Sequence, residues 1–212
     1  LAETTLGITR SNITFVGKGK DTTTILGGFV IENFENITFK NMTVTNASKY
    51  SYSELSYGIH MSNAKVELFD VALKGCGESG LRVSNTASTF SFHPSPSLTT
   101  LVATRCEFAN NGSHGVVLYN RLIIATFKNC VFKDNRKDGI QVSGHATGYP
   151  TIHLHGEATA IHSNKRYGIW ALSSGKVLIH LPSHHNTSYN NRTDRHTSIL
   201  AGSGGTITNV ED

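Results

Sequence analysis

Residues 122–143 read LIIATFKNCVFKDNRKDGIQVS, and this stretch decides the fold. Its apolar residues alternate with polar ones in three short runs, at 123–127, 130–132 and 140–142. Alternation with a period of two is typical of half-buried strands, in which successive side chains point to opposite faces. A polar arc from Lys133 to Asp138 separates the second run from Gly139, which opens the third. The stretch therefore predicts three short strands in one turn of a repeating structure.

Looser copies of this stretch recur along the chain. The third run repeats most clearly, as Gly58-Ile59, Gly80-Leu81, Gly115-Val116, Gly139-Ile140 and Gly168-Ile169. A period in the twenties, with insertions confined to loops, is the signature of a repeat fold. We predict an all-β fold, a right-handed single-stranded parallel β-helix of about seven rungs with three short strands per rung. The right hand follows from the usual crossover rule. We expect residues 1–212 to form one domain of a longer chain.

Stacked rungs place equivalent residues in columns about 4.8 Å apart. One predicted column consists of Asn111, Asn135, Asn164 and Asn190, whose side chains can hydrogen-bond along the stack. Cys106 and Cys130 share an inward column on neighbouring rungs, whereas Cys76 is level with Asn111. We expect these cysteines to be buried apolar residues rather than disulfide partners.

Three further motifs carry a resemblance to a known family: NITFVGKGKD at 12–21, ATRCEF at 103–108 and IHLPS at 179–183. With these, the chain resembles the right-handed β-helix proteins of the pectate-lyase-like superfamily, of the type found in algae, other protists and large DNA viruses. The resemblance covers nearly the whole chain and implies the fold. Because the superfamily includes lyases, hydrolases, epimerases, esterases, phage spikes and adhesins, the resemblance does not define one activity.

Charge and composition narrow the possible partners. The formal net charge is +4 and the pI is about 9.0, which favours an anionic partner over a neutral one. No basic run predicts nucleic-acid binding, and no apolar segment approaches the roughly 20 residues of a membrane span. Asn-X-Ser/Thr sequons agree with an extracellular, cell-surface or virion location, although asparagine is also common in the turns of this fold. The sequons begin at Asn12, Asn36, Asn41, Asn46, Asn111, Asn186 and Asn191.

Loop placement predicts the working face. The two largest insertions, Lys49 to Tyr57 and Thr86 to Thr100, flank the glycine-led strand, as the loops around the substrate groove do in the resembled family. Aromatic rings stack on sugar rings, and arginine pairs bidentately with a uronate or sulfate. We therefore expect this face to bind an anionic polysaccharide without a cofactor. In the alternative, the C-terminal tail simply covers Trp170 and Leu172. The predicted binding residues are Tyr119, Gln141 and Trp170, in one row with His60 and Arg82.

Any catalysis on this face is limited by its lack of carboxylates. A glycosidase needs two carboxylates across the scissile bond, and none is predicted here, so a hydrolase is disfavoured. A calcium-dependent lyase needs clustered carboxylates, and the acidic residues fall on different arcs. Metal-free β-elimination or epimerisation remains, with His60 or Arg82 as the base or charge stabiliser.

Histidines near the end of the chain raise a metal hypothesis. His155 and His180 are expected to be neighbours on adjacent rungs, with His153 on the same face and His184 and His185 in a nearby turn. Three imidazoles can hold Zn²⁺. A solvated histidine patch is the favoured reading, because the spacing is irregular and no carboxylate partner is apparent.

Two functions follow from this sequence. The first is a β-helical module that binds an anionic polysaccharide, with lyase or epimerase chemistry as its candidate activity. The second is a non-enzymatic structural or adhesive β-helix of a virion or cell surface, with other protein subunits meeting the open ends of the helix.

Overall fold

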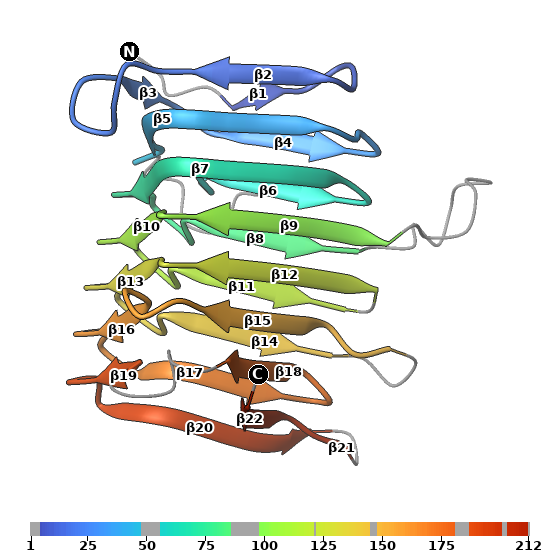
Figure 1. Cartoon of the computed structure of the whole chain (residues 1–212), viewed down its shortest axis with the longest axis vertical. Coiled ribbons are helices and arrows are strands. Elements are labelled where there is room, and N and C mark those ends of the chain that lie inside the picture. Colours follow the sequence, from blue (N-terminus) through green and yellow to red (C-terminus); the bar gives the residue numbers. More distant parts are fainter. Residues whose placement is uncertain are drawn as a thin grey trace.

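A computed structural model describes residues 5–47, 56–85, 98–120, 122–144, 148–180, 187–200 and 203–211. Its strands stack into a parallel solenoid of about six turns, and no helix occurs among these residues (Figure 1). The predicted all-β, parallel β-helical fold is therefore confirmed. In this described part of the chain, no segment has the helical length and hydropathy of a transmembrane span.

One wall of the solenoid is a nine-stranded sheet that contains all the glycine-led strands. Neighbouring strands are parallel from β1 to β20, and only β21 pairs antiparallel, with β17 and β20. In spatial order the strands are β1 (Leu6–Gly7), β4 (Phe29–Glu32), β6 (Ile59–Ser62), β8 (Leu81–Ser84), β11 (Val116–Tyr119), β14 (Ile140–Ser143), β17 (Tyr167–Leu172), β20 (Thr193–Leu200) and β21 (Ser203–Gly204).

The second sheet has thirteen strands and forms the other two walls. One of these walls contains β2 (Ile13–Val16), β9 (Thr99–Thr104), β12 (Ile123–Lys128), β15 (Thr151–His155), β18 (Lys176–His180) and β22 (Thr206–Val210). The other contains β3 (Thr24–Leu26), β10 (Glu107–Ala109), β13 (Val131–Lys133), β16 (Ala160–His162) and β19 (Ser188–Tyr189). The long strands β5 (Ile37–Thr45) and β7 (Lys65–Lys74) run through both walls and join them.

The prediction of three strands per rung therefore holds for the turns that use β9 to β19, whereas β5 and β7 each replace two strands. The corner between the two walls of the thirteen-stranded sheet is turned by residues with left-handed backbone. In β5 and β7 these are Asn41, at φ 56°, and Asp70, at φ 53°. Arg105 and Asn129 occupy the same corner in the next turns, at φ 53° and 54°. Asparagine and aspartate tolerate this conformation better than most residues, which explains their use here.

The side chains that point inward from each strand line the interior. Phe108 and Phe132 stack with ring centroids 5.0 Å apart, and Phe127 meets both edge-on at 5.6 and 5.2 Å. Cys106 and Cys130 lie beside them as free, buried thiols, as predicted. Burial raises the pKa of the Cys130 thiol well above its usual range.

A buried ladder of asparagines follows a second corner, just after β10, β13, β16 and β19. The side-chain amide of Asn111 donates to Asn135 Oδ1 at 3.0 Å, and that of Asn135 donates to Asn164 Oδ1 at 2.9 Å. Asn164 in turn donates to Asn191 Oδ1 at 2.9 Å. The predicted ladder is confirmed for three members, but the fourth is Asn191 and not Asn190.

The error at the fourth position has a conformational cause. Asn190 occupies the corner itself, with φ 54°. In the three preceding turns the same corner is occupied by Asn110, Asp134 and Ser163, at φ 56°, 57° and 57°. The ladder residue is always the one that follows this corner. Cys76 lies level with Asn111, as predicted, because its backbone N–H donates to Asn111 Oδ1 at 3.0 Å.

Candidate functional site

The outward face of the nine-stranded sheet carries the predicted row of site residues. Parallel register pairs His60 with Arg82, Arg82 with Val117, Val117 with Gln141, and Gln141 with Trp170. Four strand-to-strand steps separate His60 from Trp170, which corresponds to about 19 Å. Tyr119 lies two residues after Val117 on β11 and faces the same side. The predicted residues thus form one continuous row.

Arg82 is held between two tyrosines. Its Nη1 donates to the Tyr57 hydroxyl at 2.7 Å, and its guanidinium carbon lies 5.3 Å from the Tyr57 ring centroid and 5.4 Å from that of Tyr119. Such cation–π contacts fix the plane of a guanidinium. Among the described residues, Nε of Arg82 has no hydrogen-bond partner. Arg82 is thus a half-buried, oriented cation on this face. Tyr57 was not among the site residues predicted from the sequence.

Burial along the row is uneven. His60 and Gln141 are only 7% and 6% exposed, whereas Arg82, Tyr119 and Trp170 are half-buried. His60 Nε2 lies 3.1 Å from Ser84 Oγ. Burial raises the pKa of the Tyr119 hydroxyl, and the charge of Arg82 acts in the opposite direction. A ligand therefore meets Arg82, Tyr119 and Trp170 first, and His60 lies deeper. Most of the two predicted flanking insertions, at 48–55 and 86–97, lies outside the described residues.

A second aromatic group surrounds Trp170. The Arg166 guanidinium lies 4.6 Å from the Trp170 ring centroid, and Tyr167 stacks on His196 at 4.5 Å. Trp170 Nε1 donates to Ser198 Oγ of β20 at 3.1 Å. The C-terminal strands thus contact Trp170 but leave part of it exposed.

Leu172, two residues further along β17, is covered more fully. It is 8% exposed and pairs with Gly204 of β21. The C-terminal strands therefore cover Leu172 more fully than Trp170.

Arg166 is also close to a buried acid–base pair that sequence reasoning did not find. His114 Nδ1 lies 3.0 Å from Asp138 Oδ2, and both side chains are buried. Asp138 Oδ1 accepts the Tyr167 backbone N–H at 3.0 Å and lies 3.7 Å from Arg166 Nε. The carboxylate therefore helps to hold Arg166 against the rings of Tyr167 and Trp170. Both His114 and Asp138 directly precede a strand-opening glycine, and this shared position was the signal available in the sequence.

The three predicted histidines come together on the other side of the molecule. His153 and His155 lie on β15 and His180 ends β18, and their candidate ligand atoms all lie within 4.8 Å of one another. His153 Nδ1 is 2.9 Å from His180 Nε2. The imidazoles of His155 and His180 stack with centroids 3.9 Å apart. His184 and His185 lie outside the described residues.

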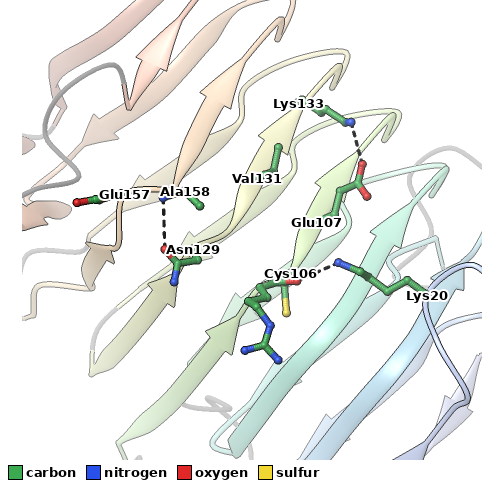
Figure 2. Close-up of a pocket in the computed structure, with 9 residues that line it drawn as sticks. Lys20, Cys106, Glu107, Asn129, Val131, Lys133, Glu157 and Ala158 are labelled. Carbon is green, nitrogen blue, oxygen red and sulfur yellow. Dashed lines mark hydrogen bonds and ion pairs between the residues drawn. The ribbon is translucent and has the colours of Figure 1, made fainter.

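An open pocket of about 590 Å³ lies beside the corner formed by Arg105 and Asn129 (Figure 2). Its charges are largely engaged within the protein: Lys133 pairs with Glu107 at 3.1 Å, and Lys20 donates to the Arg105 carbonyl at 3.1 Å. The Arg105 guanidinium binds Asp70 through two hydrogen bonds, of 3.0 and 2.6 Å. Few of the charged groups in the pocket are therefore left for a ligand. It is lined by Lys20, Arg105, Cys106, Glu107, Asn129, Val131, Lys133, Glu157 and Ala158.

The sequons divide by burial. Asn46 and Asn111 are both 0% exposed, so neither side chain can accept a glycan in the folded protein. Asn12 and Asn36 are exposed, with Asn36 Nδ2 donating to Asn12 Oδ1 at 2.9 Å. Asn186 lies outside the described residues.

The stacked parallel turns and the internal asparagine ladder define a parallel β-helix. Within this class, residues 8–156 match the family model described as a right-handed β-helix region. The chain belongs to that family. No curated protein matches the chain.

Among solved structures, the chain is similar to a thermostable pectate lyase at 11% sequence identity, with a TM-score of 0.37. The similarity covers 98% of this chain and 55% of that one. The chain thus spans about half the length of the pectate lyase.

Proposed function

We propose that the protein binds an anionic polysaccharide along the outward face of its nine-stranded sheet. The observation that supports this is the row in which Arg82 lies between Tyr57 and Tyr119, with Trp170 further along the same face. A guanidinium held in one plane can bind a carboxylate or sulfate with two parallel hydrogen bonds. The half-buried rings of Tyr119 and Trp170 supply apolar surface for sugar rings.

The row also suggests a chemistry. None of its members from His60 to Leu172 is a carboxylate, which disfavours hydrolysis by paired acids. In β-elimination a base removes the proton from the carbon next to the uronate carboxylate, and the bond from the adjacent carbon to the glycosidic oxygen breaks to leave a carbon–carbon double bond. The departing oxygen takes up a proton from water. His60 is the base in this proposal, and Arg82, its register neighbour, stabilises the negative charge that develops on the carboxylate. Epimerisation would use the same proton removal, followed by return of a proton to the opposite face.

The test is a binding and turnover screen against pectate, alginate, sulfated galactan and a neutral glucan. We expect saturable binding to the anionic chains, lowered at least about tenfold by Arg82→Gln or Trp170→Ala. Arg136→Gln, in an exposed turn, removes the same charge elsewhere and serves as the matched control. Equal weakening by Arg136→Gln would mean that net charge, and not the row, attracts the polysaccharide.

The same screen tests the chemistry. Ultraviolet absorbance of an unsaturated uronate, abolished by His60→Gln with binding retained, would establish the lyase. Binding without this absorbance, and without a change in the uronate epimer ratio, would leave a binding module. No binding by the folded protein to any of the chains would overturn the proposal.

A structural or adhesive role is the alternative, and one observation favours it. Leu6 is 53% exposed although its register partner Phe29 is buried. Ile13, Phe15 and Ile25 are only half-buried, although the residues in register with them in β5 are fully buried. A further rung from another subunit, or from another part of the same polypeptide, would cover these side chains. A cell-surface, extracellular or virion location, and kinship with algal, protist or viral β-helix proteins, belong to this proposal as well. Glycan attachment at Asn12 or Asn36 after secretion from eukaryotic cells would support the location.

A further inference from the structure

The imidazoles of His153, His155 and His180 converge on the outer face of the thirteen-stranded sheet, away from the sugar-binding row. His153 and His155 are two residues apart on β15, so both side chains point outward from the same face. Their neighbours Ile152 and Leu154 are fully buried in the core, which fixes the parity of the strand. His180 is placed alongside by the pairing of β15 with β18, in which Leu154 is in register with Ile179. The backbone therefore places three imidazoles close together on one face.

The distances between the imidazole nitrogens are close to those around a tetrahedral zinc ion. Zn–N bonds of about 2.0–2.1 Å around a tetrahedral ion place ligand nitrogens about 3.3 Å apart. Here one nitrogen pair is 2.9 Å apart, and all three candidate ligand atoms lie within 4.8 Å of one another. Small rotations of the side chains would therefore bring three nitrogens to one ion.

The strands on either side carry no acidic side chain in register with the three histidines. On β12, Thr126 is in register with His153 and Lys128 with His155. On the other side, Thr208 of β22 is in register with Leu178, and Val210 with His180. Lys128 is the only charged residue among these register neighbours, so no carboxylate there competes for the ion or pairs with a protonated imidazole.

We propose that His153, His155 and His180 form a binding site for one divalent transition-metal ion of the Zn²⁺ type. Three imidazoles leave the fourth position of a tetrahedral ion to water or to an external ligand. Imidazole selects late first-row metals over Ca²⁺ and Mg²⁺, which prefer oxygen ligands. The proposal takes up the metal alternative to the solvated histidine patch that the sequence favoured, because the candidate ligand atoms lie within 4.8 Å of one another.

Isothermal titration of the untagged, EDTA-treated protein with ZnCl₂ at neutral pH tests this site. We expect saturable binding of one ion per chain, weakened at least about 100-fold by His155→Gln or His180→Gln. Co²⁺ in place of Zn²⁺ should give the visible absorption bands of a tetrahedral ion. Ca²⁺ should show no binding here.

His162→Gln is the matched control. His162 lies on β16, stacks on Tyr189 at 5.0 Å and bonds to Ser163 Oγ at 3.0 Å, outside the three-histidine group. Circular dichroism establishes that each variant is folded. No saturable Zn²⁺ binding by the wild-type protein would overturn the proposal, and so would equal affinity in wild type, His155→Gln and His162→Gln. His153→Asp retains a ligand atom, so it should still bind one ion with reduced affinity.

Discussion

Two groups of like side chains lie on neighbouring turns of this solenoid, an asparagine stack and a histidine stack, and they differ in burial and in how their polar atoms are arranged. Asn111, Asn135 and Asn164 are at most 2% exposed, and every amide has a partner within the protein. His153, His155 and His180 are half-buried on an outer face, with two ring nitrogens directed at each other. Both stacks arise from the same parallel register. Repetition alone therefore does not assign a role: the amides donate to and accept from one another along the ladder, whereas the three histidines place ring nitrogens within 4.8 Å of one another at an outer face.

The ladder should be the more costly stack to break. Asn135→Ala removes the acceptor for the backbone N–H and side-chain amide of Asn111, and it also removes the donor to the Phe108 carbonyl. Leaving such groups buried without partners should lower the free energy of unfolding by about 3 kcal/mol, measured by chemical denaturation.

Asn190→Gly is the matched control for the ladder. Asn190 is exposed and has φ 54°, a conformation that glycine adopts readily. We expect a change within about 0.5 kcal/mol. A large loss here, together with a small loss in Asn135→Ala, would contradict the assignment of the ladder.

The histidine stack should gain stability only when metal is added. At a free Zn²⁺ concentration one hundred times Kd, the wild-type protein should gain about 2.7 kcal/mol in the free energy of unfolding. Asn135→Ala should gain the same increment, because the two stacks share no side-chain contact. His155→Gln should show no such increment in the same denaturation experiment. An equal increment in that variant would place the ion elsewhere.

In the metal-free protein, acid should lower the free energy of unfolding by a smaller amount through His153. Burial, and then the neighbouring His180, hold the folded-state pKa of His153 below the ordinary value of 6.5. As the pH falls, the imidazole of His153 is therefore protonated in the unfolded chain before it is protonated in the folded protein. The contribution to stability is therefore complete above about pH 6.5 and is lost as the pH falls through the lower, folded-state pKa. Thermal unfolding measured across this range should show less acid sensitivity in His153→Gln than in wild type. The same acid sensitivity in both proteins would contradict this assignment.

The architecture was predictable because its signals are local and repeat. A glycine followed by alternating apolar residues marked every strand from β6 to β17 of the nine-stranded sheet. Register then followed, because a shift by one residue would turn Phe127 or Ile140 outward. The fourth ladder position was wrong because Asn190 and Asn191 are adjacent asparagines, and only backbone φ distinguishes the corner from the ladder.

The candidate site was predictable in its order but not in its depth. Parity correctly placed His60, Arg82 and Gln141 in one outward row. It could not show that His60 and Gln141 are buried, because burial depends on what packs over the sheet. Nor could it find Tyr57 against Arg82, since Tyr57 precedes β6 and lies outside the alternating pattern of the strands, 25 positions before Arg82.

The in-register corners have a consequence for how such a molecule can change length. Asn111 and Asn135 occupy equivalent points exactly one turn apart, separated by 24 residues. Deleting residues 112–135 would join Asn111 to Arg136 and remove one whole turn, while Asn164 would become the next rung of the ladder. Duplication of the same segment would add a turn. Genes for this fold can therefore grow or shrink by whole turns, and the reach of the protein along an extended ligand would change in steps of about 4.8 Å.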